Sequence, residues 1–166
     1  MRLYLTGFMG SGKTTVGRVL AERLGVPFID LDREVEIASG KTVRELFEEE
    51  GEPVFREREH ETLRATLDLP DAVIATGGGT IAFERNAEVM KRAGVTVWLH
   101  PTFAMIGSRI GGLGKQDRPL FRDETQAFSL YRERLPAYGR ADWKIDIGPA
   151  ETPEEVAARI LLQVRT

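Results

Sequence analysis

The sequence predicts an α/β domain, a three-layer sandwich in which a five-stranded parallel sheet is covered by helices on both faces. Two observations support this class. Short apolar runs typical of buried strands alternate along the chain with segments whose apolar residues recur at helical spacing. No repeat or low-complexity linker interrupts the 166 residues, a length that suits one domain. We therefore predict a single domain over residues 1–166.

Each element follows from the local pattern. Apolar runs predict strands at 3–6, 27–30, 72–75, 95–99 and 143–147. Helical spacing and capping signals predict helices at 16–24, 33–39, 42–50, 53–67, 86–93 and 152–164, and another from 124 past Tyr131 that is disturbed near Pro136. The segment 107–116 holds four glycines together with Arg109 and Lys115, which predicts a mobile loop.

Composition restricts the function classes. Hydrophobic residues make up 42% of the chain and charged residues 30%, as in an ordinary globular protein, and the net charge of -3 argues against a nucleic-acid partner. The absence of cysteine excludes disulfides, thiolate zinc sites and thiol catalysis. No apolar run reaches the length of a membrane span, and the first strand starts almost at Met1. We therefore expect no membrane partner, no signal peptide, a cytoplasmic location and a monomer.

Residues 7–14, Gly-Phe-Met-Gly-Ser-Gly-Lys-Thr, form a complete G-x-x-x-x-G-K-[ST] motif between a predicted strand and a predicted helix. Its glycines allow backbone torsions that point N–H groups at phosphate oxygens, and the helix N-terminus adds partial positive charge. In this motif the lysine reaches the β- and γ-phosphates and the last hydroxyl ligates Mg²⁺. The sequence thus predicts a P-loop NTPase-type fold that binds a nucleoside triphosphate through Gly10, Ser11, Gly12, Lys13, Thr14 and Thr15.

Ligands of a parallel α/β sheet bind beyond the carboxyl ends of its strands, and this rule selects further candidates. Asp30 and Asp32 end the second strand. If the strand continues that far, both carboxylates leave on one face, one suited to Mg²⁺ and one to an acceptor hydroxyl; the alternative is that Asp32 caps the next helix. The third strand ends in Thr76 without the usual metal-supporting Asp, so we assign that role to Asp30, acting through a bound water.

Glycines and arginines supply the remaining candidates. The three glycines at 77–79 are either a plain turn or a place where a substrate approaches the backbone closely. Arg56, Arg118 and Arg134 carry guanidinium forks that suit a carboxylate or phosphate, although spacing alone does not separate them from surface arginines. The His-Glu pair at 60–61 does not complete an H-E-x-x-H motif, so we interpret both residues as surface.

Six short segments follow one another in an order that is typical of one enzyme family. They are the motif at 7–14, Asp-Leu-Asp at 30–32, Gly-Glu-x-x-Phe-Arg at 51–56, Gly-Gly-Gly at 77–79, Arg-Pro-Leu at 118–120 and Arg-x-x-x-Tyr at 134–138. With this series the chain resembles the shikimate kinases over nearly its whole length. Any P-loop kinase could supply the first segment, whereas the ordered combination of the others is specific. The resemblance implies ATP- and Mg²⁺-dependent phosphorylation of the shikimate 3-hydroxyl, a step of chorismate and aromatic amino-acid synthesis.

The resemblance also implies roles for residues. Asp32 would hold the shikimate hydroxyls and orient or deprotonate the attacking one, while Arg56 and Arg134 would bind the carboxylate. Substrate-binding helices would span about 33–62 and a lid about 109–122, in which Arg118 reaches the phosphates and Arg109 packs near adenine. The implied catalytic residues are Lys13, Asp32 and Arg118. The implied shikimate contacts are Asp32, Phe47, Phe55, Arg56, Gly77, Gly78, Gly79 and Arg134.

Two rival functions stay open at this point. A gluconate-type or nucleoside-monophosphate kinase would use the same scaffold, and gluconate is also a hydroxylated carboxylate, but the segments at 51–56 and 77–79 favour shikimate. A nucleotide-dependent switch is the alternative from another class. A GTPase switch would need an Asn-Lys-x-Asp segment, and the single Asn of the chain, Asn86, is followed by Ala87.

Overall fold

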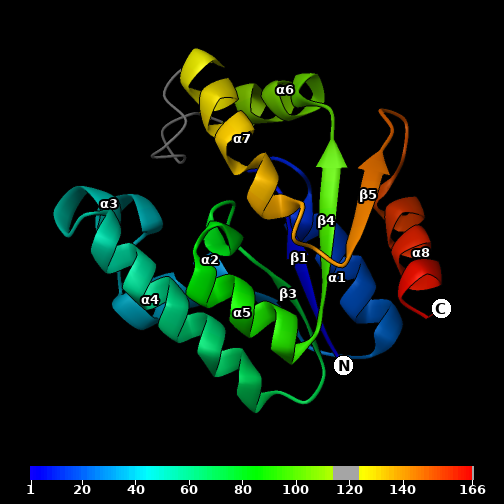
Figure 1. Ribbon diagram of the computed structural model, residues 1–166, viewed down its shortest axis with the longest axis horizontal. Helices are drawn as coiled ribbons and strands as arrows, with labels where there is room; N and C mark the ends of the chain where they lie inside the picture. The colour runs from blue at the N-terminus through cyan, green and yellow to red at the C-terminus, as the bar shows by residue number, and fades with distance from the viewer. Residues whose placement is uncertain (114–123, 166) are drawn as a thin grey trace.

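The computed structural model describes residues 1–113 and 124–165, and within these ranges five parallel strands form one sheet in the order β2-β3-β1-β4-β5 (Figure 1). The strands are β1 (Arg2–Thr6), β2 (Phe28–Asp30), β3 (Ala72–Ala75), β4 (Val95–Pro101) and β5 (Trp143–Ile147). The bounds of β3 and β5 are the predicted ones. Because β1 lies in the middle and the chain runs first to one side of it and then to the other, the loop after β1 opens at the switch point of the sheet.

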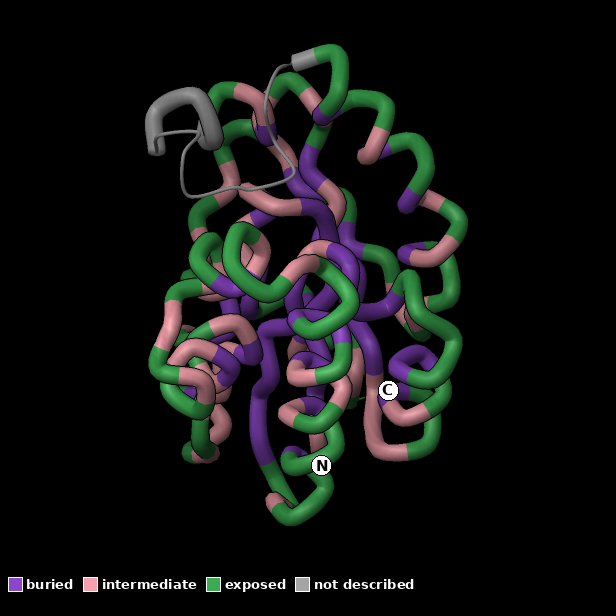
Figure 2. The backbone as a smooth tube through the Cα atoms, turned by 90° about the vertical axis from the view of Figure 1, so that its left-hand side faces the viewer, coloured by how far each residue is buried: buried purple, intermediate pink, exposed green. Residues whose placement is uncertain are grey.

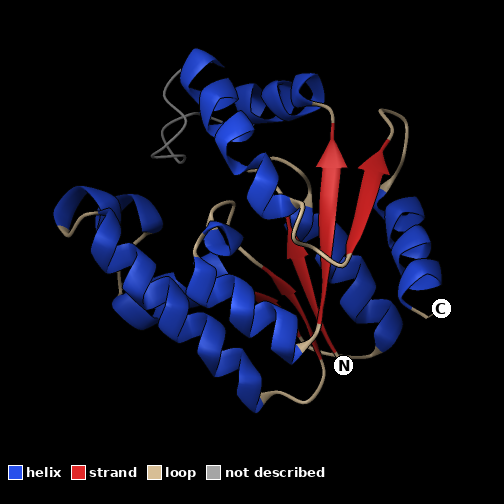
Figure 3. Ribbon diagram, in the orientation of Figure 1, coloured by secondary structure: helices blue, strands red, loops and turns tan. Residues whose placement is uncertain are grey.

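Helices cover both faces of the sheet, so the predicted three-layer sandwich is confirmed (Figure 3). Leu3 and Leu5 of β1 pack on one face with α1 and α8, whereas Tyr4 between them packs on the other face with α4, α5 and α7. Figure 2 shows the buried residues along the middle of the molecule. The helices are α1 (Lys13–Leu24), α2 (Leu31–Ser39), α3 (Val43–Glu49), α4 (Glu52–Ala65), α5 (Glu84–Ala93), α6 (Phe103–Leu113), α7 (Glu124–Tyr138) and α8 (Pro153–Val164), with short 3-10 turns η1 (Thr66–Asp68) and η2 (Thr80–Ala82).

Helices α2, α3 and α4 form a small unit beside the sheet with an apolar cluster of their own. Val35, Leu46 and Phe55, one from each helix, are buried against one another. The predicted capping box at the start of α3 is present, since the Thr42 side chain accepts from the Glu45 N–H and the Glu45 side chain reaches back to the Thr42 backbone. Contacts among these three helices, and not only contacts with the sheet, therefore stabilise this unit.

The prediction of a loop at 107–116 is wrong for residues 107–113, because these residues belong to helix α6 (Phe103–Leu113). The prediction rested on the weak helix propensity of glycine. Ile106 is buried, and Phe103 one turn before it packs against the same core cluster, so tertiary packing outweighs propensity. The rest of the predicted lid, residues 114–122, lies outside the described residues.

Two smaller differences concern the ends of elements. Helix α7 continues through Pro136 to Tyr138, so the proline lies near its end without stopping it earlier. Helix α2 begins at Leu31, directly after β2, which leaves no strand beyond Asp30. No helix in the described ranges is long and apolar enough to cross a membrane.

Candidate active site

The loop between β1 and α1, residues 7–12 and here called the phosphate-binding loop, has the backbone of an anion site. Gly7, Gly10 and Gly12 have positive φ angles of 148°, 79° and 95°, which residues with a Cβ rarely adopt. Gly12 is the N-cap of α1, and no described side chain caps the helix there or places an acidic group in its first turn. The first N–H groups of α1 and the positive end of its dipole therefore face the cavity, as the motif predicts.

Lys13 folds back along this loop. Its Nζ donates to the carbonyl oxygens of Gly7 at 2.6 Å and Phe8 at 3.2 Å. The ammonium group is held at the rim of the loop, where phosphate oxygens would be far stronger acceptors than neutral carbonyls.

Thr14 and Asp30 approach each other at the end of β2. The Thr14 hydroxyl lies 3.4 Å from Asp30 Oδ2, and Asp30 Oδ1 accepts from the Arg33 N–H at the same distance. Asp30 is thus the N-cap of α2, and Asp32 lies in the first turn of the helix. Because β2 ends at Asp30, the two carboxylates do not leave one face of a strand. The alternative that Asp32 caps the helix is also wrong, since Asp30 is the cap.

The donor set at Thr14 and Asp30 fits Mg²⁺. Both side chains offer hard oxygen ligands. Within the described part of the chain, no group of three or more His, Cys, Asp or Glu side chains is placed to hold a metal. An ion here would complete its coordination with phosphate oxygens and water, which is how Mg²⁺ binds in many phosphoryl-transfer enzymes.

One cavity of about 1040 Å³ connects the phosphate-binding loop with the carboxyl ends of β2, β3 and β5. Arg118 lies outside the described residues, and Arg109 lies on α6 with its side chain outside the described part. All other predicted site residues line this cavity: Gly10, Ser11, Gly12, Lys13, Thr14, Thr15, Asp30, Asp32, Phe47, Phe55, Arg56, Gly77, Gly78, Gly79 and Arg134. Residues up to 124 positions apart in the sequence, Gly10 to Arg134, are therefore brought to one place.

Arg56 of α4 and Arg134 of α7 meet above Gly79. Each is only 7% exposed. A Cβ on Gly79 would lie 2.8 Å from Nη2 of both guanidinium groups, closer than real Cβ contacts allow. The absence of a side chain at Gly79 thus leaves the space that the two guanidinium groups occupy, and the close approach of a substrate to this segment stays a prediction.

The two arginines differ in their charge partners. Arg56 Nη1 donates to both carboxylate oxygens of Glu59 at 3.0 and 3.3 Å, and its Nε donates to Glu52 at 3.2 Å. Arg134 forms no ion pair with any carboxylate in the described ranges. A nearly buried cation without such a partner creates a positive potential that favours an anionic ligand.

The neighbouring Gly77 has carboxylates beside it instead. A Cβ on Gly77 would lie 3.1 Å from both Asp32 Oδ1 and Glu59 Oε2. On the outer side of the cavity, the rings of Phe47 and Phe55 are in contact, with centroids 4.9 Å apart. The cavity wall therefore combines a cationic end at Gly79, acceptor oxygens near Gly77 and an apolar surface.

Sequence reasoning predicted no role for two residues beside this site, although one of them, Tyr138, ends the Arg-x-x-x-Tyr segment. Glu59 has a side chain that is 1% exposed and pairs with Arg56; its spacing of three residues on a predicted helix was the available signal. Tyr138 donates from its hydroxyl to the Gly78 carbonyl oxygen at 2.5 Å. Burial raises the Tyr138 pKa to about 12, so the phenol stays protonated as a donor.

The interpretation of His60 as a surface residue is wrong. His60 is half-buried, and its Nδ1 lies 2.7 Å from Asn86 Oδ1. Its place on the inner side of α4, one residue after Glu59, explains the difference, because helix α5 covers it. Glu61 is exposed as expected.

A family model described as shikimate kinase matches residues 9–165. The chain belongs to the shikimate kinase family. It is therefore an ATP-dependent kinase, which agrees with a phosphate-binding loop and a second recognition surface in one cavity.

Relatives in the family cover nearly all of the chain. The shikimate kinase of Sulfurihydrogenibium sp. is 36% identical over 98% of this chain and 97% of its own, and that of Symbiobacterium thermophilum is 47% identical over 85% and 83%. The structure of shikimate kinase from Acinetobacter baumannii in complex with shikimate has a TM-score of 0.93 at 36% identity, covering 99% of this chain and 92% of the other. The structure from Aquifex aeolicus has a TM-score of 0.85 at 37% identity, covering 99% and 96%.

Proposed function

We propose that the protein transfers the γ-phosphate of ATP to the 3-hydroxyl of shikimate and releases ADP and shikimate 3-phosphate, a step of chorismate and aromatic amino-acid synthesis. The observation that carries the proposal is the pair of nearly buried guanidinium groups, Arg56 and Arg134, above Gly79. They line the same cavity as the phosphate-binding loop. The acceptor should therefore be a small molecule with one anionic group, and shikimate is a cyclic polyol that carries a carboxylate.

The carboxylate of shikimate would bind between these two guanidinium groups. Arginine pairs with a carboxylate through two parallel N–H···O bonds, which fixes orientation as well as position. Arg134, which has no carboxylate partner in the described ranges, supplies the larger part of the attraction. The ring would then lie against Phe47 and Phe55, with its hydroxyls toward Asp32.

Asp32 would accept the hydrogen bond of the attacking hydroxyl. As the oxygen forms its bond to the γ-phosphorus, the proton passes to the carboxylate, and the β–γ bridging oxygen leaves with ADP. Since phosphoryl transfer depends mainly on positioning and charge stabilisation, the orientation that Asp32 gives the hydroxyl is its main contribution.

The donor side would be held by the phosphate-binding loop. Backbone N–H groups from Gly10 to Thr15 surround the phosphates, and Lys13 exchanges its loop carbonyls for β- and γ-phosphate oxygens. Thr14 would ligate Mg²⁺ and Asp30 would hold it through water; when bound, the ion neutralises charge on the phosphates. We assign Arg118 to the transferring phosphate and Arg109 to the adenine on the strength of the family resemblance, and we propose a cytoplasmic monomer.

A panel assay of ADP release tests this proposal. The protein is incubated with ATP, Mg²⁺ and either shikimate, gluconate, AMP or CMP. We expect turnover with shikimate and only background with the other three. Turnover with gluconate alone would overturn the proposal, and an equal rate of ATP loss with every acceptor would favour a nucleotide switch.

A further inference from the structure

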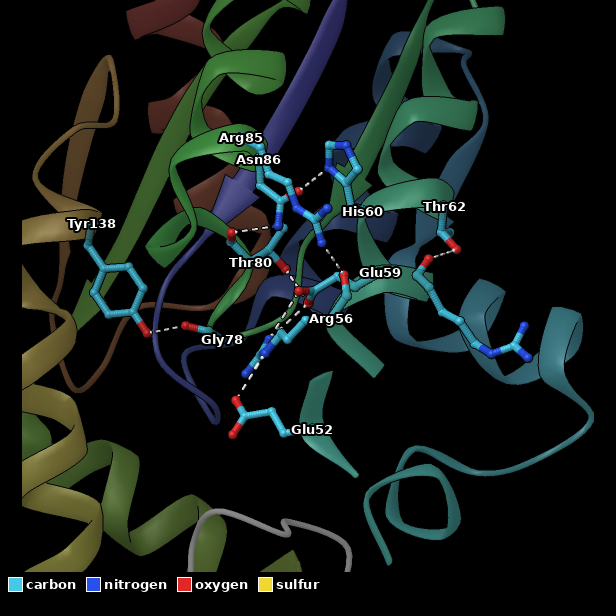
Figure 4. A network of polar contacts seen from close by, with 11 residues as sticks. Glu52, Arg56, Glu59, His60, Thr62, Gly78, Thr80, Arg85, Asn86 and Tyr138 are labelled. Carbon is cyan, nitrogen blue, oxygen red and sulfur yellow. Dashed lines mark hydrogen bonds and ion pairs between the residues drawn. The ribbon is translucent and has the colours of Figure 1, made fainter. Parts of the chain in front are cut away.

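We propose that Thr80 and Asn86 are positioning residues of the acceptor site, acting through Glu59 on the guanidinium of Arg56. The inference rests on the proposed function, since the group that Arg56 holds is taken to be the carboxylate of shikimate. Its basis is a closed set of hydrogen bonds, here called the polar ring, formed by Glu59 and His60 of α4 with Thr80 and Asn86 (Figure 4).

Glu59 is the member of the polar ring that touches Arg56. Its side chain is 1% exposed, and both oxygens accept from Arg56 Nη1. Oε2 also accepts from the Thr80 hydroxyl at 2.8 Å. A buried carboxylate needs such donors on its oxygens. Glu52, the second partner of Arg56, is 45% exposed, whereas the Thr80 hydroxyl that donates to Glu59 is buried, so we take this hydroxyl to be the donor that fixes the orientation of the Glu59 carboxylate.

Thr80 is in turn fixed by Asn86. Thr80 is fully buried and directly follows Gly79, and its carbonyl oxygen accepts from Asn86 Nδ2 at 3.0 Å. Asn86 is 1% exposed, and its Oδ1 lies 2.7 Å from His60 Nδ1. Because the amide nitrogen already donates to Thr80, the amide oxygen accepts and His60 carries its proton on Nδ1. His60 is the neighbour of Glu59, so the polar ring closes on α4.

The polar ring controls how close the Arg56 guanidinium lies to that of Arg134, which matters for binding a carboxylate between them. A Cβ on Gly77 would meet Glu59 Oε2 at 3.1 Å and the Thr80 hydroxyl at 3.2 Å, while one on Gly79 would meet Arg56 at 2.8 Å. Glu59 therefore lies beside Gly77, and its ion pair with Arg56 links it to the cationic end at Gly79. If Glu59 rotates, the Arg56 guanidinium leaves its place beside Arg134, and two forks no longer converge on one carboxylate. Small misplacements of such groups weaken binding strongly.

A structural role alone makes a different prediction. The polar ring also ties α4 to the segment that leads into α5, so its loss could lower stability and leave ligand binding unchanged. The two roles separate in kinetics: positioning changes the shikimate constants, whereas a structural role changes only the melting temperature.

The test compares three variants with the wild type. Thr80→Val removes the hydroxyl at nearly constant shape, and Thr80→Ser keeps the hydroxyl. Thr62→Val is the matched control. The Thr62 hydroxyl lies on α4, as Glu59 does, and donates at 2.8 Å to the Arg58 carbonyl oxygen, outside the polar ring (Figure 4). For each we measure KM for shikimate, KM for ATP, the Kd of shikimate by calorimetry, and Tm.

We expect Thr80→Val to raise KM and Kd for shikimate by about tenfold to about a hundredfold, the effect of losing a hydrogen bond to a buried charged group. KM for ATP should stay within about twofold, and Thr80→Ser and Thr62→Val should resemble the wild type. Asn86→Ala should show the same split, and its effect should not add fully to that of Thr80→Val, because both act through Glu59.

The inference is overturned if Thr80→Val and Thr80→Ser share the wild-type shikimate constants, whatever their Tm values. An equal rise in KM for ATP would also overturn it. Should Thr80→Val not fold, Thr80→Ala is judged by the same outcomes. Failure of the proposed function would look different, since the wild type itself would then not turn over shikimate.

Discussion

At the scale of single residues, we propose that Arg134 is the main determinant of acceptor recognition. Its guanidinium is nearly buried, lies beside that of Arg56 and has no carboxylate partner in the described ranges. We predict that Arg134→Lys raises KM for shikimate by about tenfold to about a hundredfold and leaves KM for ATP within about twofold, because a lysine ammonium cannot make the bidentate contact. Steady-state kinetics with each substrate varied in turn checks this. A fall in ATP affinity with unchanged shikimate affinity would contradict the assignment of Arg134.

The raised pKa of Tyr138 makes the stability of the folded protein depend on pH at high pH. Burial raises its pKa from 10.0 to about 12, so the folded state holds the phenolic proton more tightly than the unfolded state does. The stabilisation is complete below about pH 10 and is lost as the pH rises toward about 12, where the unfolded chain binds fewer protons. The loss amounts to at most about 3 kcal/mol.

The variant Tyr138→Phe isolates this effect. Below pH 10 it should be less stable than the wild type by about 1 kcal/mol, because the Gly78 carbonyl oxygen loses its donor at 2.5 Å. Between about pH 10 and 12 its free energy of unfolding should fall less steeply than that of the wild type. Urea unfolding at a series of pH values measures both. Parallel curves over that interval would show that Tyr138 does not hold its proton through burial.

At the scale of elements, the glycines that allow close approach fall into two kinds. A Cβ on Gly79 would meet the flexible ends of Arg56 and Arg134 at 2.8 Å, whereas one on Gly94 would meet the backbone oxygen of Arg2 at 2.2 Å. Flexible side chains can move aside and a paired strand cannot. Gly79→Ala should therefore keep Tm within a few degrees and raise KM for shikimate at least about tenfold, while Gly94→Ala should destabilise the fold by about 2–4 kcal/mol.

Thermal melts and shikimate kinetics on both variants check this contrast. The decisive result is the combination for Gly79→Ala. If that variant binds shikimate normally, the arginines do not need the space that the glycine leaves. If it unfolds, the glycine serves the turn and not the ligand.

Elements with local signals were predictable from the sequence, and elements defined by packing were not. The phosphate-binding loop, β3, β5 and the capping box at Thr42 carry their signals within a few residues, and the structure has them where predicted. Helix α6 was missed because Ile106 becomes buried only once the sheet is assembled. The bond between His60 and Asn86 joins two helices and likewise depends on their packing, so spacing within either helix gave no sign of it.

At the scale of the whole molecule, the position of β1 joins the two halves of the site. Its carboxyl end leads into the phosphate-binding loop, and its neighbour β3 leads into the glycine segment at 77–79. Helices α4 and α7 come from opposite parts of the chain and deliver Arg56 and Arg134 to that segment. An acceptor held by both arginines would contact elements from distant parts of the chain, and its binding should therefore stabilise the fold as a whole.

This arrangement predicts how ligands change the melting temperature. A ligand at about a hundred times its Kd stabilises the folded state by about 2.7 kcal/mol, which corresponds to a rise in Tm of about 5–10 °C for a chain of this size. We expect ATP with Mg²⁺ and shikimate each to give such a rise. In Arg134→Lys, the rise with ATP should persist, and the rise at the same shikimate concentration should shrink to about 1–6 °C, because a tenfold to hundredfold weaker Kd leaves only about 0.4–1.4 kcal/mol of stabilisation. Differential scanning fluorimetry over a range of ligand concentrations measures both. A Tm that responds to ATP and never to shikimate would contradict a two-substrate cavity, and an undiminished shikimate response in the variant would move the carboxylate away from Arg134.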